Sequence, residues 1–418
     1  MIRALAPLTV WTLLIASAGC SDEPAPPGAD PVVRDSAGVT LVEAPVPEHG
    51  PADGWEVEEE PFLSIGEMDA EEEAYLFSDL QWAVLLPDGR IKVPDRGSHE
   101  VRLFDQEGTF LQSFGGPGQG PGEFSLAPAK TYAYRGDSIA VVEATGRTIH
   151  IFGSDGEFGR TITPEFRYQR SQGAVPRQSC CVIHEPLPDG RWVAQYPEEG
   201  PVDGSGVRRG SFELLLLSAE GEHLGRLGTF PGGLWRDAPS EHPSPITRVT
   251  LSGTPQVSIR DDRILLGNGE DFRVDEWDGE GTWVRSIRID REPPAFDQDA
   301  RRAYERGMRE AAAEAESTGH SAELMRAGFD VLPDHLPAYS RILTDPDGRM
   351  WLLAATVPRV HPTPRHALVL DPEATVLGQV DLPEGLHPVQ IGDDEILGIT
   401  RDELDVPRVV LHRIVRDR

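Results

Sequence analysis

The sequence predicts an all-β fold, a six-bladed β-propeller whose blades are four-stranded antiparallel sheets. Short apolar runs rich in Val, Ile, Leu and Phe recur along the chain, and Asp-Gly or Glu-Gly turns bound them, which is the pattern of antiparallel hairpins. In three copies the two turns lie 19 residues apart, at Gly89 and Gly108, Asp137 and Gly156, and Asp262 and Gly281. A repeat at a fixed spacing predicts one structural unit for each copy.

The clearest copy lies between residues 80 and 115. Its apolar runs predict strands at 80–86, 90–95, 101–105 and 109–114. Five further copies of the same pattern begin at Gly136, Leu187, Asp261, Asp345 and Asp393. Six copies of a four-stranded meander predict six blades.

The ends of the chain indicate how the ring closes. The last copy runs out of sequence after its third strand, whereas the segment Val39 to Ile65 has apolar runs but no unit of its own. Because a propeller hides its edge by closing, we expect this segment to supply the outer strand of the last blade. An open β-solenoid is the competing architecture, and it would need capping at both ends.

One stretch departs from the strand pattern. Residues 297–327 mix Ala with Glu and Arg at helical spacing, which predicts a helical insert between blades four and five. Such an insert either caps one mouth of the central channel or packs on the surface. Both interpretations remain open at this point.

The segment from Phe104 to Phe124 carries a resemblance. It contains Phe-Asp-Gln-Glu-Gly, then Phe114-Gly115, then a Gly-Pro-Gly run that ends in Glu123-Phe124, and it resembles the repeat of NHL-type six-bladed propellers. The similarity extends over roughly residues 39–416. It implies the fold but not an activity, because such propellers serve as binding scaffolds, lyases, lactonases and quinoprotein dehydrogenases.

The N-terminus predicts export. Arg3 precedes an apolar stretch, Leu5 to Ala18, which is too short to span a bilayer comfortably, so residues 1–19 are interpreted as a lipoprotein signal peptide. The run ending in Gly19-Cys20 resembles the bacterial lipobox, although Ser17 stands where that family usually has Leu. The resemblance implies acylation of Cys20 and an outer-membrane lipoprotein that faces the periplasm or the cell surface. Residues 20–32 then form a flexible tether and residues 33–418 the propeller, whereas an ordinary signal peptide would release the protein.

The charge limits the partners. Asp and Glu number 70 against 39 Lys and Arg, which gives a formal net charge of -31. This charge repels phosphate backbones, so we expect no nucleic acid partner. The expected partners are a membrane, through the lipid anchor, and an envelope protein, peptide or glycan.

Motifs of known chemistry are scarce. The adjacent cysteines Cys180 and Cys181 could form a strained vicinal disulfide near the channel, or they could be two small apolar core residues. The Gly-rich run 115–122 lacks the Gly-Lys-Ser or Gly-Lys-Thr of a phosphate loop, and His361 and His366 have no third ligand nearby. We therefore predict no catalytic residues and no metal ligands.

The innermost strands converge on the central channel, where a small ligand would be bound. The alternation along these strands predicts six channel-lining ligand contacts, Trp82, Tyr132, His184, Gln256, Arg341 and Gln390. A slip of one residue in the alternation would turn each of them away.

The resulting functional hypothesis is a non-catalytic binding or scaffolding module for a protein, peptide or glycan. The alternative is a propeller enzyme of the lactonase, lyase or quinoprotein type with a divalent ion bound in the channel. No other cofactor is indicated.

Overall fold

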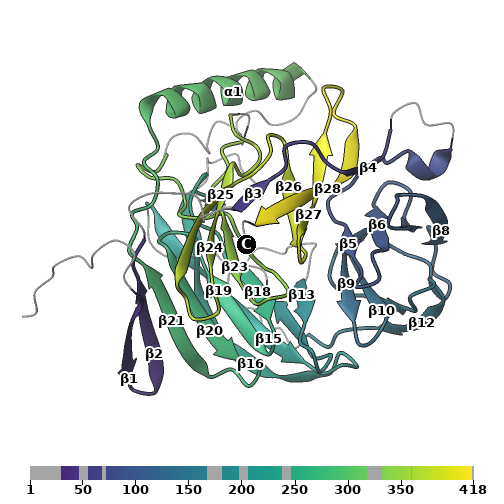
Figure 1. Ribbon diagram of the computed structural model, residues 1–418, viewed down its shortest axis with the longest axis horizontal. Helices are drawn as coiled ribbons and strands as arrows, with labels where there is room; N and C mark the ends of the chain where they lie inside the picture. Colours follow the sequence, from purple (N-terminus) through teal and green to yellow (C-terminus); the bar gives the residue numbers. More distant parts are fainter. Residues whose placement is uncertain are drawn as a thin grey trace, which may run out of the picture.

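The computed structural model describes residues 30–46, 55–67, 72–166, 181–196, 206–237, 246–317, 332–358 and 360–416. Over these ranges the chain forms six separate sheets, and each contains a meander of antiparallel strands. Figure 1 shows the blades following one another along the chain, from blue through teal and green to yellow. The sequence prediction of a six-bladed β-propeller is confirmed.

The strands of the first three blades follow the order of the sequence. The first blade contains β5 (Val84–Leu85), β6 (Ile91–Asp95), β7 (Glu100–Phe104) and β8 (Phe110–Gly115). The second contains β9 (Pro128–Tyr134), β10 (Ser138–Glu143), β11 (Ile149–Phe152) and β12 (Phe158–Ile162). The third contains β13 (Val182–Pro186), β14 (Trp192–Gln195), β15 (Arg208–Leu217), β16 (His223–Asp237) and the short β17 (Ile246–Arg248).

The remaining blades repeat the same order. The fourth contains β18 (Gln256–Arg260), β19 (Arg263–Gly267), β20 (Arg273–Asp278) and β21 (Trp283–Ile289). The fifth contains β22 (Arg341–Thr344), β23 (Met350–Leu353), β24 (His366–Leu370) and β25 (Val376–Asp381). The sixth contains β26 (His387–Ile391), β27 (Glu395–Arg401) and β28 (Pro407–Arg416).

The N-terminal strands complete two different blades. β3 (Trp55–Val57) and β4 (Leu63–Ile65) pair antiparallel with β28, so the beginning of the chain supplies the outer strand of the last blade, as predicted. The first part of the same segment behaves differently, because β2 (Val39–Ala44) pairs parallel with β21 and β1 (Val32–Ser36) pairs with β2. A 3-10 turn, η1 (Glu73–Tyr75), leads into the first blade.

The six innermost strands form a closed ring. β5 contacts β9, β9 contacts β13, β13 contacts β18, β18 contacts β22, β22 contacts β26, and β26 returns to β5. A closed ring leaves no innermost strand with an open side, which is how this architecture removes its exposed edge. It also brings side chains of all six blades towards one axis.

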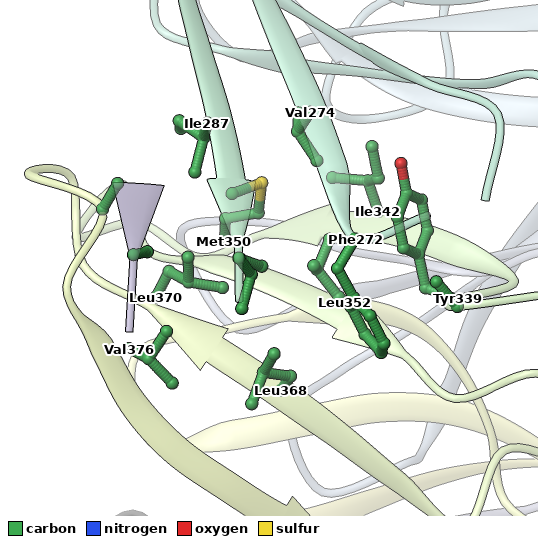
Figure 2. Packing of buried hydrophobic residues seen from close by; sticks show 14 of the residues in the cluster. Phe272, Val274, Ile287, Tyr339, Ile342, Met350, Leu352, Leu368, Leu370 and Val376 are labelled. Atoms are coloured by element: carbon green, nitrogen blue, oxygen red, sulfur yellow. The ribbon is translucent and has the colours of Figure 1, made fainter. Parts of the chain in front are cut away.

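The hydrophobic core lies between neighbouring blades. Figure 2 shows one such layer, in which Val274 and Ile287 of the fourth blade face Met350, Leu352 and Leu370 of the fifth. All five side chains are almost completely buried. Since the blades are covered on both faces, their strands are apolar on both faces too, and β11 is buried at all four positions.

A buried polar network recurs in the first two blades. In the first blade the Asp95 carboxylate accepts a hydrogen bond from the Ser78 hydroxyl (3.0 Å) and one from the Arg102 guanidinium (3.3 Å). In the second blade Glu143 holds the equivalent place, with the Ser125 hydroxyl 3.0 Å and the His150 ring 3.2 Å from its oxygens. The network ties the inter-blade connection to the second and third strands of each blade.

Helix α1 (Gln298–Ser317) follows β21 and precedes β22, within the predicted insert. Asp297 caps its N-terminus by accepting hydrogen bonds from the backbone N–H of Asp299 and Ala300, both at 2.8 Å. Figure 1 shows α1 across the top of the view, outside the blades, and Tyr304 buries its ring against Phe296 and Val357. Residues 318–327 of the predicted insert lie outside the described residues. In the described part of the chain, no helix combines the length and the apolar character needed to cross a membrane.

Candidate functional site

The structure brings Trp82, Tyr132 and Arg341 together although they belong to three different blades. Trp82 lies just before β5, Tyr132 is on β9, and their rings meet edge to face with 6.0 Å between centroids. The Arg341 guanidinium, from β22, lies over the Trp82 indole with its central carbon 4.7 Å from the ring centroid. The indole N–H donates to the backbone oxygen of Thr131 (2.8 Å), which fixes the ring between the first and second blades.

Arg341 is the centre of this cluster. One of its terminal nitrogens donates a hydrogen bond to the backbone oxygen of Pro388 in the sixth blade (3.0 Å). Burial lowers the pKa of Arg341 to about 10, although Tyr132 and Glu185 act in the opposite direction. The side chain therefore reaches from the fifth blade to Trp82 of the first and Pro388 of the sixth.

Lys130 is a second cation on the same indole, and sequence reasoning missed it. Its ammonium lies 5.7 Å from the centroid of the Trp82 ring. Within the described ranges, it makes neither a hydrogen bond nor an ion pair. Burial, and to a smaller extent the charge of Arg341, lowers the pKa of Lys130 to about 8. Lys130 is two residues before Tyr132 on the same strand, so the period-two alternation already placed both on one face.

Glu185 brings the acidic group of the cluster. It is next to His184 on β13, and solvent still reaches it although protein lies around it. Burial raises the pKa of Glu185 to about 7, and the positive charge of Arg341 opposes that shift. Glu185 is thus a carboxyl group that titrates near neutral pH.

Two histidines flank these charges and are held neutral. Nε2 of His184 lies 3.1 Å from Oε1 of Gln195, and burial, reinforced by Lys130, lowers the pKa of His184 to about 3. On β26, burial and then Arg341 lower the pKa of His387 below its ordinary value. Neither ring adds positive charge at neutral pH.

The two predicted glutamines form hydrogen bonds outside this cluster. The Gln390 amide donates to the backbone oxygen of Leu85 (3.1 Å) and accepts from its N–H (2.9 Å), which joins the sixth blade to the first. The Gln256 amide donates to the Thr254 hydroxyl at 2.8 Å. Among the described residues, neither Gln256 nor Gln390 forms a hydrogen bond with Trp82, Tyr132, Lys130 or Arg341.

Of the three cysteines in the chain, only Cys181 lies among the described residues. Cys181 is buried immediately before β13, next to the innermost strand of the third blade. Cys180 and Cys20 lie outside the described residues, so the vicinal disulfide and the lipid attachment stay predictions. Among the described side chains, no group of three or more His, Cys, Asp or Glu is arranged to hold a metal ion.

Comparisons with known proteins show no family for this chain and include solved structures of low similarity. No family model matches the chain, and no curated protein matches it in sequence. A candidate exported protein of Bacteroides fragilis aligns with a TM-score of 0.47 at 9% identity, covering 90% of this chain and 100% of that one. A member of the DUF4221 family of Bacteroides vulgatus gives 0.47 at 11% identity, covering 88% and 99%.

A third similar structure belongs to an enzyme. The catalytically inactive virginiamycin B lyase of Staphylococcus aureus, solved with quinupristin, gives a TM-score of 0.40 at 8% identity, covering 86% of this chain and 100% of that one. The sheet topology and the ring of innermost strands define the class of this protein, a six-bladed β-propeller.

Proposed function

We propose that this protein is an exported binding module that recognises a group of a protein, peptide or glycan at the axis of its propeller. The observation that carries the proposal is the convergence of Arg341 and Lys130 on Trp82 from three blades. Neither cation has a carboxylate within ion-pair distance among the described residues. Buried or half-buried cations are normally paired with an anion, so two that converge on one indole without a carboxylate partner among the described residues support a site for an external ligand.

The rigidity of the site supports binding. Tyr132 donates from its hydroxyl to the backbone oxygen of Ile183 (3.1 Å), Trp82 is fixed by Thr131, and Arg341 is fixed by Pro388. Side chains that are already held in place lose little conformational freedom when a ligand binds, which favours affinity. The cluster also joins side chains of the first, second and fifth blades, which lie far apart in the sequence.

Export and anchoring belong to the same proposal. The signal-like residues 1–19 and Cys20 support attachment to the outer membrane by a lipid, with residues 20–32 as the tether. The test is the mass of the protein recovered from its own envelope, which should carry acyl chains on Cys20. An unmodified chain that begins after Ala18 or Gly19 would contradict anchoring but not binding.

The binding proposal is tested by native mass spectrometry of the protein extracted in mild detergent, followed by variants. We expect a ligand mass on the wild type that is lost in Arg341→Gln and Lys130→Met. Arg226→Gln is the matched control, because Arg226 is an exposed arginine paired with Glu213 on the outer strands. Retention of the ligand by both channel variants would contradict the proposal, and circular dichroism checks that each variant is folded.

One observation favours the enzyme alternative. Glu185, with a pKa of about 7, and Lys130, with a pKa of about 8, are an acid and a base that both titrate near neutral pH in one channel. Groups poised in this way can transfer protons during a reaction. Turnover of a lactone panel by the wild type, with loss in Glu185→Gln and a bell-shaped pH profile, would favour this alternative over simple binding.

A further inference from the structure

We propose that the junction between the third and fourth blades binds a second group of the ligand, a protonated amine or a guanidinium, between the Glu185 carboxylate and the inner backbone edge of β18. The inference rests on the proposed function, because it adds a subsite of opposite charge to the same axial site. It comes from a comparison of the six junctions between neighbouring innermost strands. Five of these junctions are bridged by a side chain, and the junction of β13 with β18 is not bridged among the described residues.

The bridges share one design. A side-chain donor at one innermost strand binds a backbone oxygen of the neighbouring innermost strand, on the edge that is not paired within its own blade. The five bridges are Arg341 to Pro388 (3.0 Å), Gln390 to Leu85 (3.1 Å), Trp82 to Thr131 (2.8 Å), Tyr132 to Ile183 (3.1 Å) and Thr344 to Ile259 (3.0 Å). β13 and β18 are in contact like the other neighbours, but no such bond joins them in the described part of the chain.

The polar side chains of β13 explain the missing bridge. The strand has only two of them, His184 and Glu185. His184 directs Nε2 to Oε1 of Gln195 in its own blade (3.1 Å). Glu185 has a pKa of about 7, and above that pH its carboxylate only accepts hydrogen bonds. Among the described residues it has no hydrogen-bond or ion-pair partner. The third blade therefore has an acceptor where four other blades have a donor.

A β-bulge turns Glu185 towards the fourth blade. The pairing of β13 with β14 shifts between Ile183 and Pro186, so that Glu185 lies opposite Val193. Residues opposite each other in an antiparallel pair lie on the same face of the sheet. Val193 belongs to the buried cluster that also contains Ile259 of β18. Glu185 is therefore on the face of β13 that meets β18, and solvent reaches its side chain.

Across the junction, β18 offers a second acceptor. The oxygen of Ile259 is on the inner edge of β18, because the Thr344 hydroxyl reaches it from β22. Peptide groups alternate between the two edges of a strand, so the oxygen of Val257, two residues earlier, points to the same edge. Among the described residues, no donor binds the Val257 oxygen.

The chemistry of the junction selects a cationic donor. A carboxylate and a backbone oxygen both accept hydrogen bonds, so the group that joins them has to donate to both. An ammonium has three N–H groups and a guanidinium five, and each also supplies the positive charge that a carboxylate binds most strongly. A neutral hydroxyl has one hydrogen and cannot serve both acceptors at once.

The experiment is isothermal titration calorimetry of the full mature chain at pH 8. The probes are Nα-acetyl-lysinamide, Nα-acetyl-argininamide and glucosamine, with N-acetylnorleucinamide as the uncharged match of the lysine probe. We expect the cationic probes to bind, and Glu185→Gln to weaken them at least about tenfold, because hydrogen bonds to a charged group are lost. The matched control is Glu220→Gln, which changes an exposed glutamate on the turn between β15 and β16 and should bind like the wild type.

Thermal unfolding of the same variant gives a second readout. Glu185→Gln should unfold at the temperature of the wild type or above it, because the new amide can donate to β18 as Gln390 donates to Leu85. A lower unfolding temperature would mean that Glu185 already has a partner in the native protein, and this would overturn the subsite.

The outcomes separate this inference from the proposed function. Equal affinity of the cationic probes for the wild type and Glu185→Gln, or no binding of any probe, would overturn the subsite. Binding of N-acetylnorleucinamide as tightly as Nα-acetyl-lysinamide would also overturn it. None of these results contradicts the proposed function, which fails only if Arg341→Gln and Lys130→Met keep the native ligand. Tighter binding of glucosamine than of the two peptide probes would assign the amine to a glycan, and the reverse order would assign it to a peptide.

Discussion

Replacing Asp95 by Ala tests whether the buried networks hold the blades together. The Asp95 side chain is 1% exposed and accepts hydrogen bonds from Ser78, from the backbone of Asp79 and Gly97, and from Arg102. Arg102 is 4% exposed, so Asp95→Ala leaves a buried guanidinium with only the partly exposed Glu100 carboxylate, 3.9 Å away, beside it. Removing one partner of a buried pair costs about 3 to 5 kcal/mol, and we expect a loss of unfolding free energy in that range.

The assay is equilibrium urea unfolding followed by tryptophan fluorescence, with the free-energy change taken from the midpoint and the slope. The control is Glu213→Ala, which breaks an exposed pair with Arg226 and should cost about 1 kcal/mol or less. In the double variant with Arg102→Met, the loss should be smaller than the sum of the two single losses, since the unpaired charge is gone. A loss for Asp95→Ala as small as that of the control would refute the reasoning.

Three further predictions concern buried or strained positions. Lys92 is fully buried, and within the described residues its ammonium donates one hydrogen bond, a long one of 3.4 Å to the Gly153 oxygen. Lys92→Met should therefore raise stability at pH 7 by about 1 kcal/mol or more in thermal unfolding. Because burial lowers the pKa of Lys92 to about 8 in the folded state, the gain should shrink as the pH rises from 8 to 10.5, and a gain that grows instead would contradict this account. Gly146→Ala should cost at least about 2 kcal/mol of unfolding free energy in urea, since the backbone φ of Gly146 is 66° and the new Cβ would clash with the backbone oxygen of Cys181. The control is Gly136→Ala, which should cost about half as much, because Gly136 has a similar φ of 64° but no atom lies near its added Cβ. His184 has a folded-state pKa of about 3, against an ordinary value of 6.5, so the wild type should lose stability as the pH falls below 6.5. His184→Gln should lose less stability over the same pH range. Equal slopes of unfolding free energy against pH in the two proteins would exclude His184 as the cause.

The architecture could be predicted because it is encoded locally. Each hairpin needs a turn residue that tolerates a left-handed backbone, and Gly89 and Gly108 provide it with φ of 84° and 81°. Such turns repeat at one spacing, so they reveal the blades without any knowledge of packing. The pairing of β2 with β21 could not be predicted, because it is a parallel contact between segments far apart in the sequence. Neither a turn motif nor the repeat spacing indicates such a contact.

The cluster at the axis was only partly predictable. The positions of the innermost strands predicted Trp82, Tyr132 and Arg341. The same alternation could also have predicted Lys130. His387 was not, because the register of β26 shifts between Pro388 and Gln390, which breaks the alternation there. The reach of Arg341 to Trp82 also depends on ring closure, and a long flexible side chain gives no sign in the sequence of which blade it will meet.

The pairing of β3 and β4 with β28 has a consequence for biosynthesis. Leu63 leaves the ribosome early, but its partner Leu411 is made about 350 residues later. At ~5 to 20 residues per second this interval is on the order of 20 to 70 s, and during that time β3 and β4 have no partner strand. The nascent chain therefore cannot close its ring until the last blade has been made.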